Sequence, residues 1–324
     1  MNEDGNFLVD ALRRQLSGLV TSEGIRAIEG GASAADLWRE LDGSGFADAM
    51  LPEMAGGAGI GLAQAFPLLF AAGEFCVPVP FAETIIARGM LAAQGVSAPP
   101  GAAIIFAPSS AILPGGRLAS HALVDRDGVP TLIAVTGAGN DLFGTGGATS
   151  LEEREVLAAL APDPDAILVA AAAVAAGLMA GAMARVLEMS LRYASERQQF
   201  GRSLGKFQAI QQQLAVLAEQ VLSAQVAART AFVGTAFDPV RVAAAKCRAN
   251  EAGGIVCNIA HAIHGAIGVT AEFDLQLYTR RIKQWQLAFG SESFWGARLG
   301  QARVASRLAT TSDFLRLRFG AEVM

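Results

Sequence analysis

An uncharged run of eighteen residues, ILVAAAAVAAGLMAGAMA from Ile167 to Ala184, limits the fold more than any other feature of this sequence. As a helix it is long enough to cross a membrane. Alanine and glycine gain little from lipid, however, and the run continues into RVLEMSLRYASER without an aromatic belt or a basic stop. We therefore expect a helix that is buried on all sides, inside a bundle or between subunits, and no membrane span.

The composition indicates a protein with a large core. The chain has 324 residues, of which 52% are hydrophobic and 17% charged, which is enough for two or three packed units. The net charge of -5 does not indicate a basic surface for nucleic acid, so we expect no nucleic-acid partner. Cys76, Cys247 and Cys257 form no metal-ligating pattern, and the N-terminus does not look like a secretory signal. We expect buried thiols, no metal site and a cytoplasmic location.

Three regions differ in their hydrophobic patterns. Residues 1–98 carry helical stripes, residues 99–164 carry short β-branched runs bounded by Gly and Pro, and residues 165–324 are helical again. Within the middle region, the sequence DRDG at 125–128 predicts a hairpin. The last region predicts four long helices with short links, over about 165–195, 203–234, 239–264 and 273–311. The expected fold class is mainly α, with an N-terminal helical domain, a reduced middle β-domain and a C-terminal four-helix bundle.

A polar stretch, RYASERQQFGRSLGKFQAIQ from Arg192 to Gln211, links the first two of these helices. We expect Arg197, Gln199 and the backbone near Phe200–Gly201 to face outwards at a helix end, with Ser203 able to cap the second helix. A guanidinium beside backbone N–H groups at a helix start suits a phosphate or pyrophosphate. The alternative is an inter-helix turn with solvated charges, which these physical arguments alone favour.

A second stretch, HGAIGVTAEFDLQLYTRR from His264 to Arg281, follows the third expected helix. The small residues Gly265, Ala266 and Gly268 allow another backbone or a ligand to approach closely. The alternative is a glycine-containing turn between helices, which is common in bundles.

Together the two stretches resemble the C-terminal domain of the acyl-CoA dehydrogenases. That family's first pattern, Tyr-x-x-x-Arg-x-x-Phe-Gly followed by a Gln, is matched by Tyr193, Arg197, Phe200, Gly201 and Gln208. Its second pattern, His-Gly-Gly-x-Gly-x-x-x-Glu with a later Arg, is matched for the most part by His264, Gly265, Gly268, Glu272 and Arg280. The segment from Phe46 to Ala87 is similar to the helical first domain of small bacterial members.

The resemblance implies an oxidoreductase that acts on an acyl-CoA thioester. In this family a glutamate takes the α proton and the β hydrogen leaves as hydride to the flavin of FAD. The FAD lies at a subunit interface, so the resemblance also implies a dimer or tetramer, with like or unlike subunits. The residues that it marks as contacts to FAD are Arg197, Gln199, Phe200, Gly201, Gln208, Gly265 and Ser291.

The catalytic base of the family is missing from this sequence. Gly290 and Ser291 align with the pair that follows the usual glutamate, so Phe289 stands at the base position. The alternative position in some members aligns with about Ala171. Glu292 is a weak replacement candidate and Glu251 a weaker one. The catalytic residue is therefore unknown, and the middle region is too short to build the family's barrel around flavin and thioester.

Three hypotheses follow from these losses. We favour a short subunit that pairs with a catalytic one, as in the unlike-subunit tetramers of some bacterial members, notably in steroid side-chain degradation. The second is an active homo-oligomer with a displaced base. The third is a non-catalytic scaffold that keeps only the oligomer interface. The sequence does not identify the acyl group, and only analogy suggests a ring-bearing CoA ester.

Overall fold

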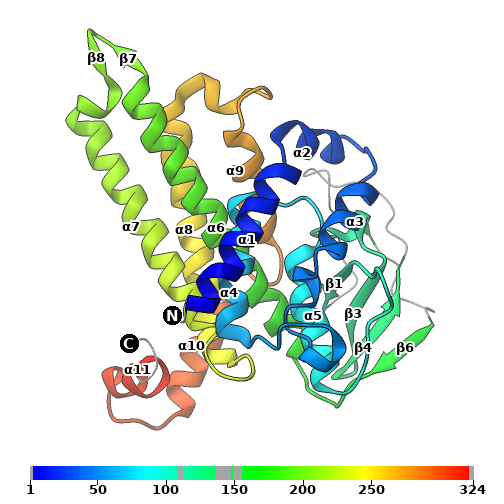
Figure 1. The fold of residues 1–324 in the computed structure, drawn as a ribbon. Coiled ribbons are helices and arrows are strands. Elements are labelled where there is room, and N and C mark those ends of the chain that lie inside the picture. Colours follow the sequence, from blue (N-terminus) through cyan, green and yellow to red (C-terminus); the bar gives the residue numbers. More distant parts are fainter. Residues whose placement is uncertain (1–2, 109–111, 136–146, 149–154, 321–324) are drawn as a thin grey trace.

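The computed structural model describes residues 3–108, 112–135, 147–148 and 155–320. The chain begins with five helices, continues through a small sheet and ends in a set of long helices (Figure 1). The N-terminal helices are α1 (Glu3–Leu19), α2 (Ser22–Glu29), α3 (Ala35–Gly43), α4 (Leu62–Glu74) and α5 (Phe81–Ala93). Because α4 packs on α6 (Ala166–Glu196) and α5 packs on β1 (Ile104–Ala107), these helices connect the bundle to the sheet.

The uncharged run forms most of α6, and the core surrounds it. Both α6 and the segment Pro239–Val269 are apolar and long enough to cross a membrane. In α6, however, 89% of the most apolar 18-residue window is buried inside the protein. Such burial is typical of a core helix. Two glycines let α4 and α6 approach backbone to backbone: a methyl group on Gly73 would meet the carbonyl oxygen of Leu178, and one on Gly181 would meet that of Phe70.

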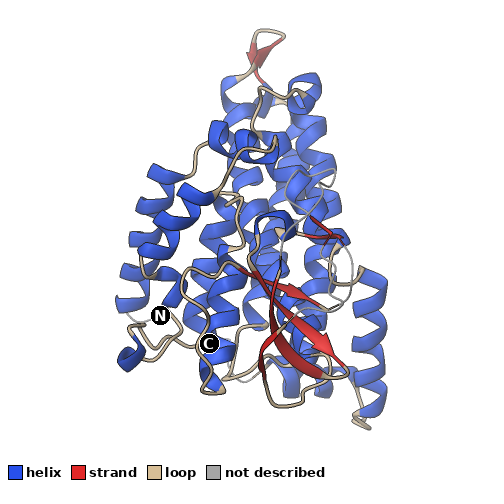
Figure 2. Cartoon of the chain, turned by 90° about the vertical axis from the view of Figure 1, so that its right-hand side faces the viewer, coloured by secondary structure: helices blue, strands red, loops and turns tan. Residues whose placement is uncertain are grey.

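The middle region forms a four-stranded sheet in the order β1-β3-β4-β6. The strand β3 (His121–Arg126) runs parallel to β1 and antiparallel to β4 (Val129–Ala134), and β6 (Val156–Ala159) completes the sheet. Asp127 and Gly128 both have positive φ, of 53° and 80°, which is the backbone of a tight hairpin turn and confirms the predicted DRDG hairpin. A short pair, β2 (Ile112–Leu113) and β5 (Gly147–Ala148), lies apart from this sheet. Figure 2 shows the strands beside the helices.

The C-terminal region contains three long helices that pack on one another: α6, α7 (Gln208–Thr230) and α8 (Pro239–His264). The fourth expected helix, over 273–311, is wrong as a single element. It is broken into α9 (Leu275–Leu287) and α10 (Glu292–Ala305), followed by α11 (Thr311–Phe319). The break has a backbone cause, because Phe289 and Gly290 have φ of 60° and 97°, outside the helical region.

Candidate functional site

The polar stretch after α6 forms a hairpin rather than a simple turn. Strands β7 (Gln198–Gln199) and β8 (Arg202–Ser203) pair antiparallel, with Phe200 and Gly201 at the tip. In Figure 1 this hairpin lies at the top of the molecule, beyond the helices. The second helix therefore begins at Gln208 and not at 203, and Ser203 does not cap it, since Ser203 pairs with Gln198 in the hairpin.

The hairpin holds its aromatic tip in an unfavourable backbone conformation. Phe200 has φ of 52° and its side chain is 91% exposed. A bulky residue with positive φ costs about 1–2 kcal/mol, and burial of the ring does not offset that cost here. The guanidinium of Arg202 lies 4.1 Å from the ring centroid of Phe207, and the Phe200 ring meets that ring edge-on. Both tip residues, Phe200 and Gly201, have positive φ, as the central residues of a two-residue hairpin turn require.

The glycine-rich turn after α8 lies at the same end of the bundle as the hairpin. Tyr193, in the last turn of α6, stacks on His264 at 4.5 Å between ring centroids. His264 is buried and its Nδ1 lies 2.8 Å from the carbonyl oxygen of Ala260, while burial lowers its pKa. The stack places Gly265, with φ of 63°, close to the end of α6 from which the hairpin rises. Arg197, Gln199, Phe200, Gly201, Gln208 and Gly265 are all exposed.

Ser291 does not belong to this group. It is the N-cap of α10, where its Oγ accepts a hydrogen bond from the backbone N–H of Phe294 at 3.2 Å. The helix α10, which Ser291 caps, lies towards the end of the bundle away from the hairpin (Figure 1). The structure therefore brings the hairpin residues, Gln208 and Gly265 to one end and leaves Ser291 apart from them.

Phe289, which the resemblance aligns with the family's base, packs against two hydrophobic cores. Among the described residues, Phe289 is the partly buried apolar residue that packs both against the main core and against the smaller core of the sheet. That smaller core consists of Ile105, Ala107, Ala119, Ala122, Val124, Ile133 and Val135. The indole N–H of Trp295 donates to the carbonyl oxygen of Phe289 at 2.8 Å, which fixes the backbone at this point. The backbone and ring of Phe289 are therefore held by contacts within this chain.

A buried lysine, which the sequence analysis missed, holds the link between α9 and α10. Lys246 is fully buried, and its Nζ lies 2.6 Å from Oδ1 of Asn250 and 2.9 Å from the carbonyl oxygen of Trp285. The amide of Asn250 donates to the carbonyl oxygen of Gly290 at 3.1 Å. Burial lowers the pKa of Lys246 to about 7, although the charge of Glu292 opposes that shift. The only sequence signal was a lysine inside the apolar segment VAAAKC.

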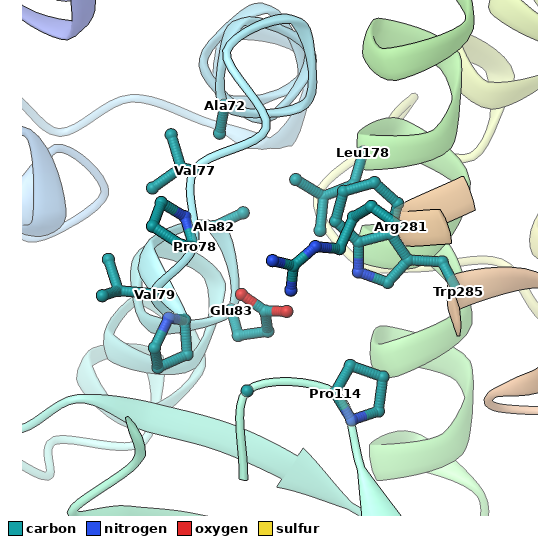
Figure 3. Close-up of a pocket in the computed structure, with 12 residues that line it drawn as sticks. Ala72, Val77, Pro78, Val79, Ala82, Glu83, Pro114, Leu178, Arg281 and Trp285 are labelled. Carbon is teal, nitrogen blue, oxygen red and sulfur yellow. The ribbon is translucent and has the colours of Figure 1, made fainter. Parts of the chain in front are cut away.

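A second missed group is Glu83 on α5, within the apolar segment PFAETII. Its carboxylate points across a small pocket towards the guanidinium of Arg281, beside Leu178 and Trp285 (Figure 3). Burial raises the pKa of Glu83 to about 7, against the opposing effects of its own backbone and of Arg281. The pocket holds about 10 Å³, which is room for a single water and not for a thioester.

Arg281 and its neighbour Arg280 attach α9 to the N-terminal helices. Glu29, at the end of α2, pairs with Arg281 at 2.9 Å and with Arg280 at 3.1 Å. Both Glu29 and Arg281 are buried. Arg280, which matched the second family pattern, therefore has a structural partner inside this chain.

The two candidate replacement bases lie elsewhere. Glu292 is exposed in the first turn of α10, and Glu251 pairs with Arg248 at 3.1 Å on the surface of α8. Neither lines the small pocket beside Glu83 and Arg281. The thiols of Cys76 and Cys257 are buried, which raises their pKa to about 11 and about 12, whereas Cys247 is only half-buried. Within the described ranges, three or more metal-ligating side chains nowhere come together.

Comparison with known proteins agrees with this architecture. Residues 166–301 match the family model described as acyl-CoA dehydrogenase, C-terminal domain. The acyl-CoA dehydrogenase IpdE2 of Mycolicibacterium smegmatis is 31% identical over 301 residues, covering 87% of this chain and 93% of that protein.

Two solved structures share the fold over nearly the whole chain. The ChsE4-ChsE5 complex from Mycobacterium tuberculosis gives a TM-score of 0.81 at 23% identity, covering 95% of this chain and 99% of the matched one. A variant of the Tcur3481-Tcur3483 steroid ACAD gives a TM-score of 0.81 at 27% identity, covering 94% and 99%.

The fold and the paired motifs define a mainly helical protein of the acyl-CoA dehydrogenase type, an oxidoreductase fold. By its similarity over almost its full length, this chain belongs to the acyl-CoA dehydrogenase family. Members of that family bind FAD.

Proposed function

We propose that this chain is the non-catalytic subunit of a FAD-dependent acyl-CoA dehydrogenase and that it works with a related subunit that carries the base. The observation that carries the proposal is the contrast between two places. The hairpin of Arg197 is intact, exposed and strained, whereas the base position is filled by Phe289, packed against the sheet. In this proposal the chain retains the hairpin that contacts FAD at the subunit interface, and it has lost its own reaction site at Phe289.

The hairpin end fits part of FAD. Arg197 offers a guanidinium for a phosphate, Phe200 offers an exposed ring face for an aromatic ring, and Gly265 allows a close backbone approach. These groups would contact an FAD molecule that the partner subunit binds. When bound, FAD supplies the hydride-accepting chemistry, and this chain's residues orient it.

The place of the flavin ring in this chain does not fit FAD equally well. The Phe289 ring packs against the smaller core of the sheet, and hydrogen bonds to the backbone at 289–290 hold it there. We therefore assign the reaction site, the base and most of the FAD contacts to the partner subunit. Relatives of this length are named for a two-component complex and for a steroid ACAD, which favours a ring-bearing acyl-CoA as the substrate of the assembly.

The test is a dehydrogenase assay on this chain alone and with its related full-length subunit. Alone, the chain should give no turnover of acyl-CoA with an artificial electron acceptor. Together, the two should be active, and replacing the base glutamate of the full-length subunit by Gln should abolish that activity. Turnover by the isolated chain would instead favour an active homo-oligomer with a displaced base.

A further inference from the structure

Three aromatic rings from separate segments meet where the hairpin and the glycine-rich turn leave the helices. Tyr193 comes from the last turn of α6, His264 from the end of α8, and Phe273 from the link before α9. The Tyr193 and His264 rings stack at an interplanar angle of 26°, and the Phe273 ring lies 5.2 Å from that of His264. The carbonyl oxygen of Tyr193 accepts from the backbone N–H of Arg197 at 2.9 Å. The stack therefore connects the base of the hairpin to the residue before Gly265.

His264 has one ring nitrogen with a partner and one without. Its Nδ1, 2.8 Å from the carbonyl oxygen of Ala260, carries the proton, because a carbonyl oxygen only accepts. Its Nε2 is buried and has no hydrogen-bond partner among the residues that the structure describes. Protonation would place a charged N–H donor there. The stacked ring of Tyr193 covers the face of the imidazole, whereas this N–H would point from the ring edge, so the stack supplies no acceptor.

The other histidine at this end of α8 supplies no counter-charge. His261 lies one turn before His264, with its Nε2 3.0 Å from Oγ1 of Thr279, and its buried Nδ1 also lacks a partner in the described part of the chain. Burial and the like charge of His261 both lower the pKa of His264. A Cβ on Gly268 would lie 3.0 Å from Cβ of His264 and 3.3 Å from Nδ1 of His261, so the glycine-rich turn packs directly on both rings.

The carboxylates on the neighbouring segments face solvent or another cation. Glu196, at the end of α6, and Glu272, before α9, are both exposed. Asp274 pairs with Arg26 of α2 at 2.7 Å. The aromatic partners in the stack are a neutral phenol and a phenyl ring. A proton on the buried imidazole would thus stay without a compensating anion unless the ring moved.

We propose that His264 is a positioning residue: its neutral ring holds the hairpin and the glycine-rich turn in fixed relative positions for FAD, and protonation opens the stack and weakens that contact. The charged ring moves until water reaches Nε2, because a buried charge without a partner is costly. Since the same ring contacts Tyr193 and precedes Gly265, the two segments lose their mutual support. Only the last step, the contact with FAD, rests on the proposed function.

The direction of the pH dependence follows from the two states of the ring. In the open state His264 titrates near its ordinary pKa of 6.5, and in the stack burial holds the pKa lower, so the open state binds more protons in acid. The stack is fully stable above about pH 6.5 and loses stability as pH falls below that value. Acid should therefore loosen this end of the bundle.

The first measurement uses the full chain alone, which has only three histidines and two tyrosines. NMR of labelled His and Tyr rings follows it from about pH 8 to pH 5. His264 should titrate below 6.5, and the ring of Tyr193 and the amides of Arg197 and Gly265 should shift with the same midpoint. In His264→Phe, which keeps a stacking ring without a titrating nitrogen, those shifts should vanish, whereas His121→Phe, in the sheet, should leave them unchanged. If His264 titrates while Tyr193 and the two amides stay fixed, the proposal is overturned.

The second measurement uses the complex with the related subunit. Its dissociation constant for FAD should rise at least about tenfold from about pH 7.5 to pH 5.5, and His264→Phe should remove all but about twofold of that rise. An equal rise in both complexes would overturn the link to FAD. Failure of the proposed function would appear instead as turnover by the isolated chain, and the NMR titration, which needs neither flavin nor partner, would still decide the role of His264.

Discussion

At the scale of single residues, Lys246 holds a backbone link with hydrogen bonds and has no acidic partner within bonding distance in the described structure. Lys246→Met should lower the free energy of unfolding by about 1–3 kcal/mol, because the carbonyl oxygen of Trp285 loses its donor. Lys206→Met, at an exposed position, should change it by less than about 0.5 kcal/mol. Urea unfolding measures both values, and equal stability of the two variants would contradict the assigned role.

The pH dependence of stability gives Lys246 a second signature. Its pKa is near 7 when folded and about 10.5 when unfolded, so the unfolded chain binds more protons between these values. This group therefore makes stability rise with pH from about 7 towards 10, by at most about 1.4 kcal/mol per pH unit. The difference in stability between the protein and Lys246→Met should grow over that window. A constant difference would show that Lys246 is not buried as described.

Glu83 should show the opposite dependence. Its pKa is about 7 when folded and 4.5 in its ordinary state, so the folded chain binds the extra proton between those values. The stability from this group is present below about pH 4.5 and is lost as pH rises to about 7. Glu83→Gln should therefore be more stabilising at pH 8 than at pH 5, whereas the exposed Glu53→Gln should show no such trend. Thermal unfolding at the two pH values checks this, and a reversed trend would contradict it.

At the scale of elements, the break between α9 and α10 depends on glycine at 290. A Cβ there would lie 2.7 Å from both Cδ1 of Phe294 and Nε1 of Trp295, at a φ of 97°. Gly290→Ala should destabilise the protein by about 2–5 kcal/mol through strain and overpacking. Gly300→Ala, inside α10 with nothing near its Cβ, should instead stabilise it by about 1 kcal/mol. Chemical unfolding of the two variants should give opposite signs.

The strained hairpin tip can be tested with two variants that both remove its ring. Phe200→Gly relieves the positive φ, whereas Phe200→Ala keeps it. The Gly variant should be more stable than the Ala variant by about 0.5–1 kcal/mol, which is the relieved strain less the backbone entropy of glycine. In a complex with the related subunit, both should retain flavin less well. An Ala variant that is the more stable of the two would show that the tip is not strained.

Local sequence predicted the elements whose signals lie within the chain segment itself. The helix expected over about 165–195 matches α6 to within one residue at each end, and DRDG predicted its hairpin. The β7–β8 hairpin was missed because its strands have two residues each, too short for a periodic pattern. The break at Phe289 was missed because it depends on hydrogen bonds to the backbone from Trp295, in the next helix, and from Asn250, which is distant in sequence.

The candidate site was predictable only in part, for a related reason. The two family patterns placed the hairpin and Gly265 together, because their helices run in parallel and end at the same side. Ser291 was grouped with them by alignment alone, and the structure sets it apart. Burial of Lys246 and Glu83 results from the packing of several elements, so no window of sequence reports it.

At the scale of the whole molecule, the hairpin that we propose contacts the cofactor and the Phe289 that we propose replaces the base lie at different places. The hairpin lies at the tip of the bundle, while Phe289 packs against the main core and the smaller core of the sheet. Most of α8, roughly 28 Å at 1.5 Å per residue, separates Lys246, beside the link, from the turn at Gly265. We propose that the two places serve different flavins in an assembly with a second, related subunit.

The most direct measurement is the flavin absorbance of this chain alone, of its complex with the related subunit, and of the complex carrying Arg197→Ala. Arg192→Ala, another exposed arginine near the end of α6, is the matched control. The account predicts a colourless isolated chain, a yellow complex, loss of most flavin with Arg197→Ala and full retention with Arg192→Ala, since a charge-assisted contact contributes about 1.5–3 kcal/mol. A yellow, active isolated chain, or a complex that keeps its flavin without Arg197, would contradict it.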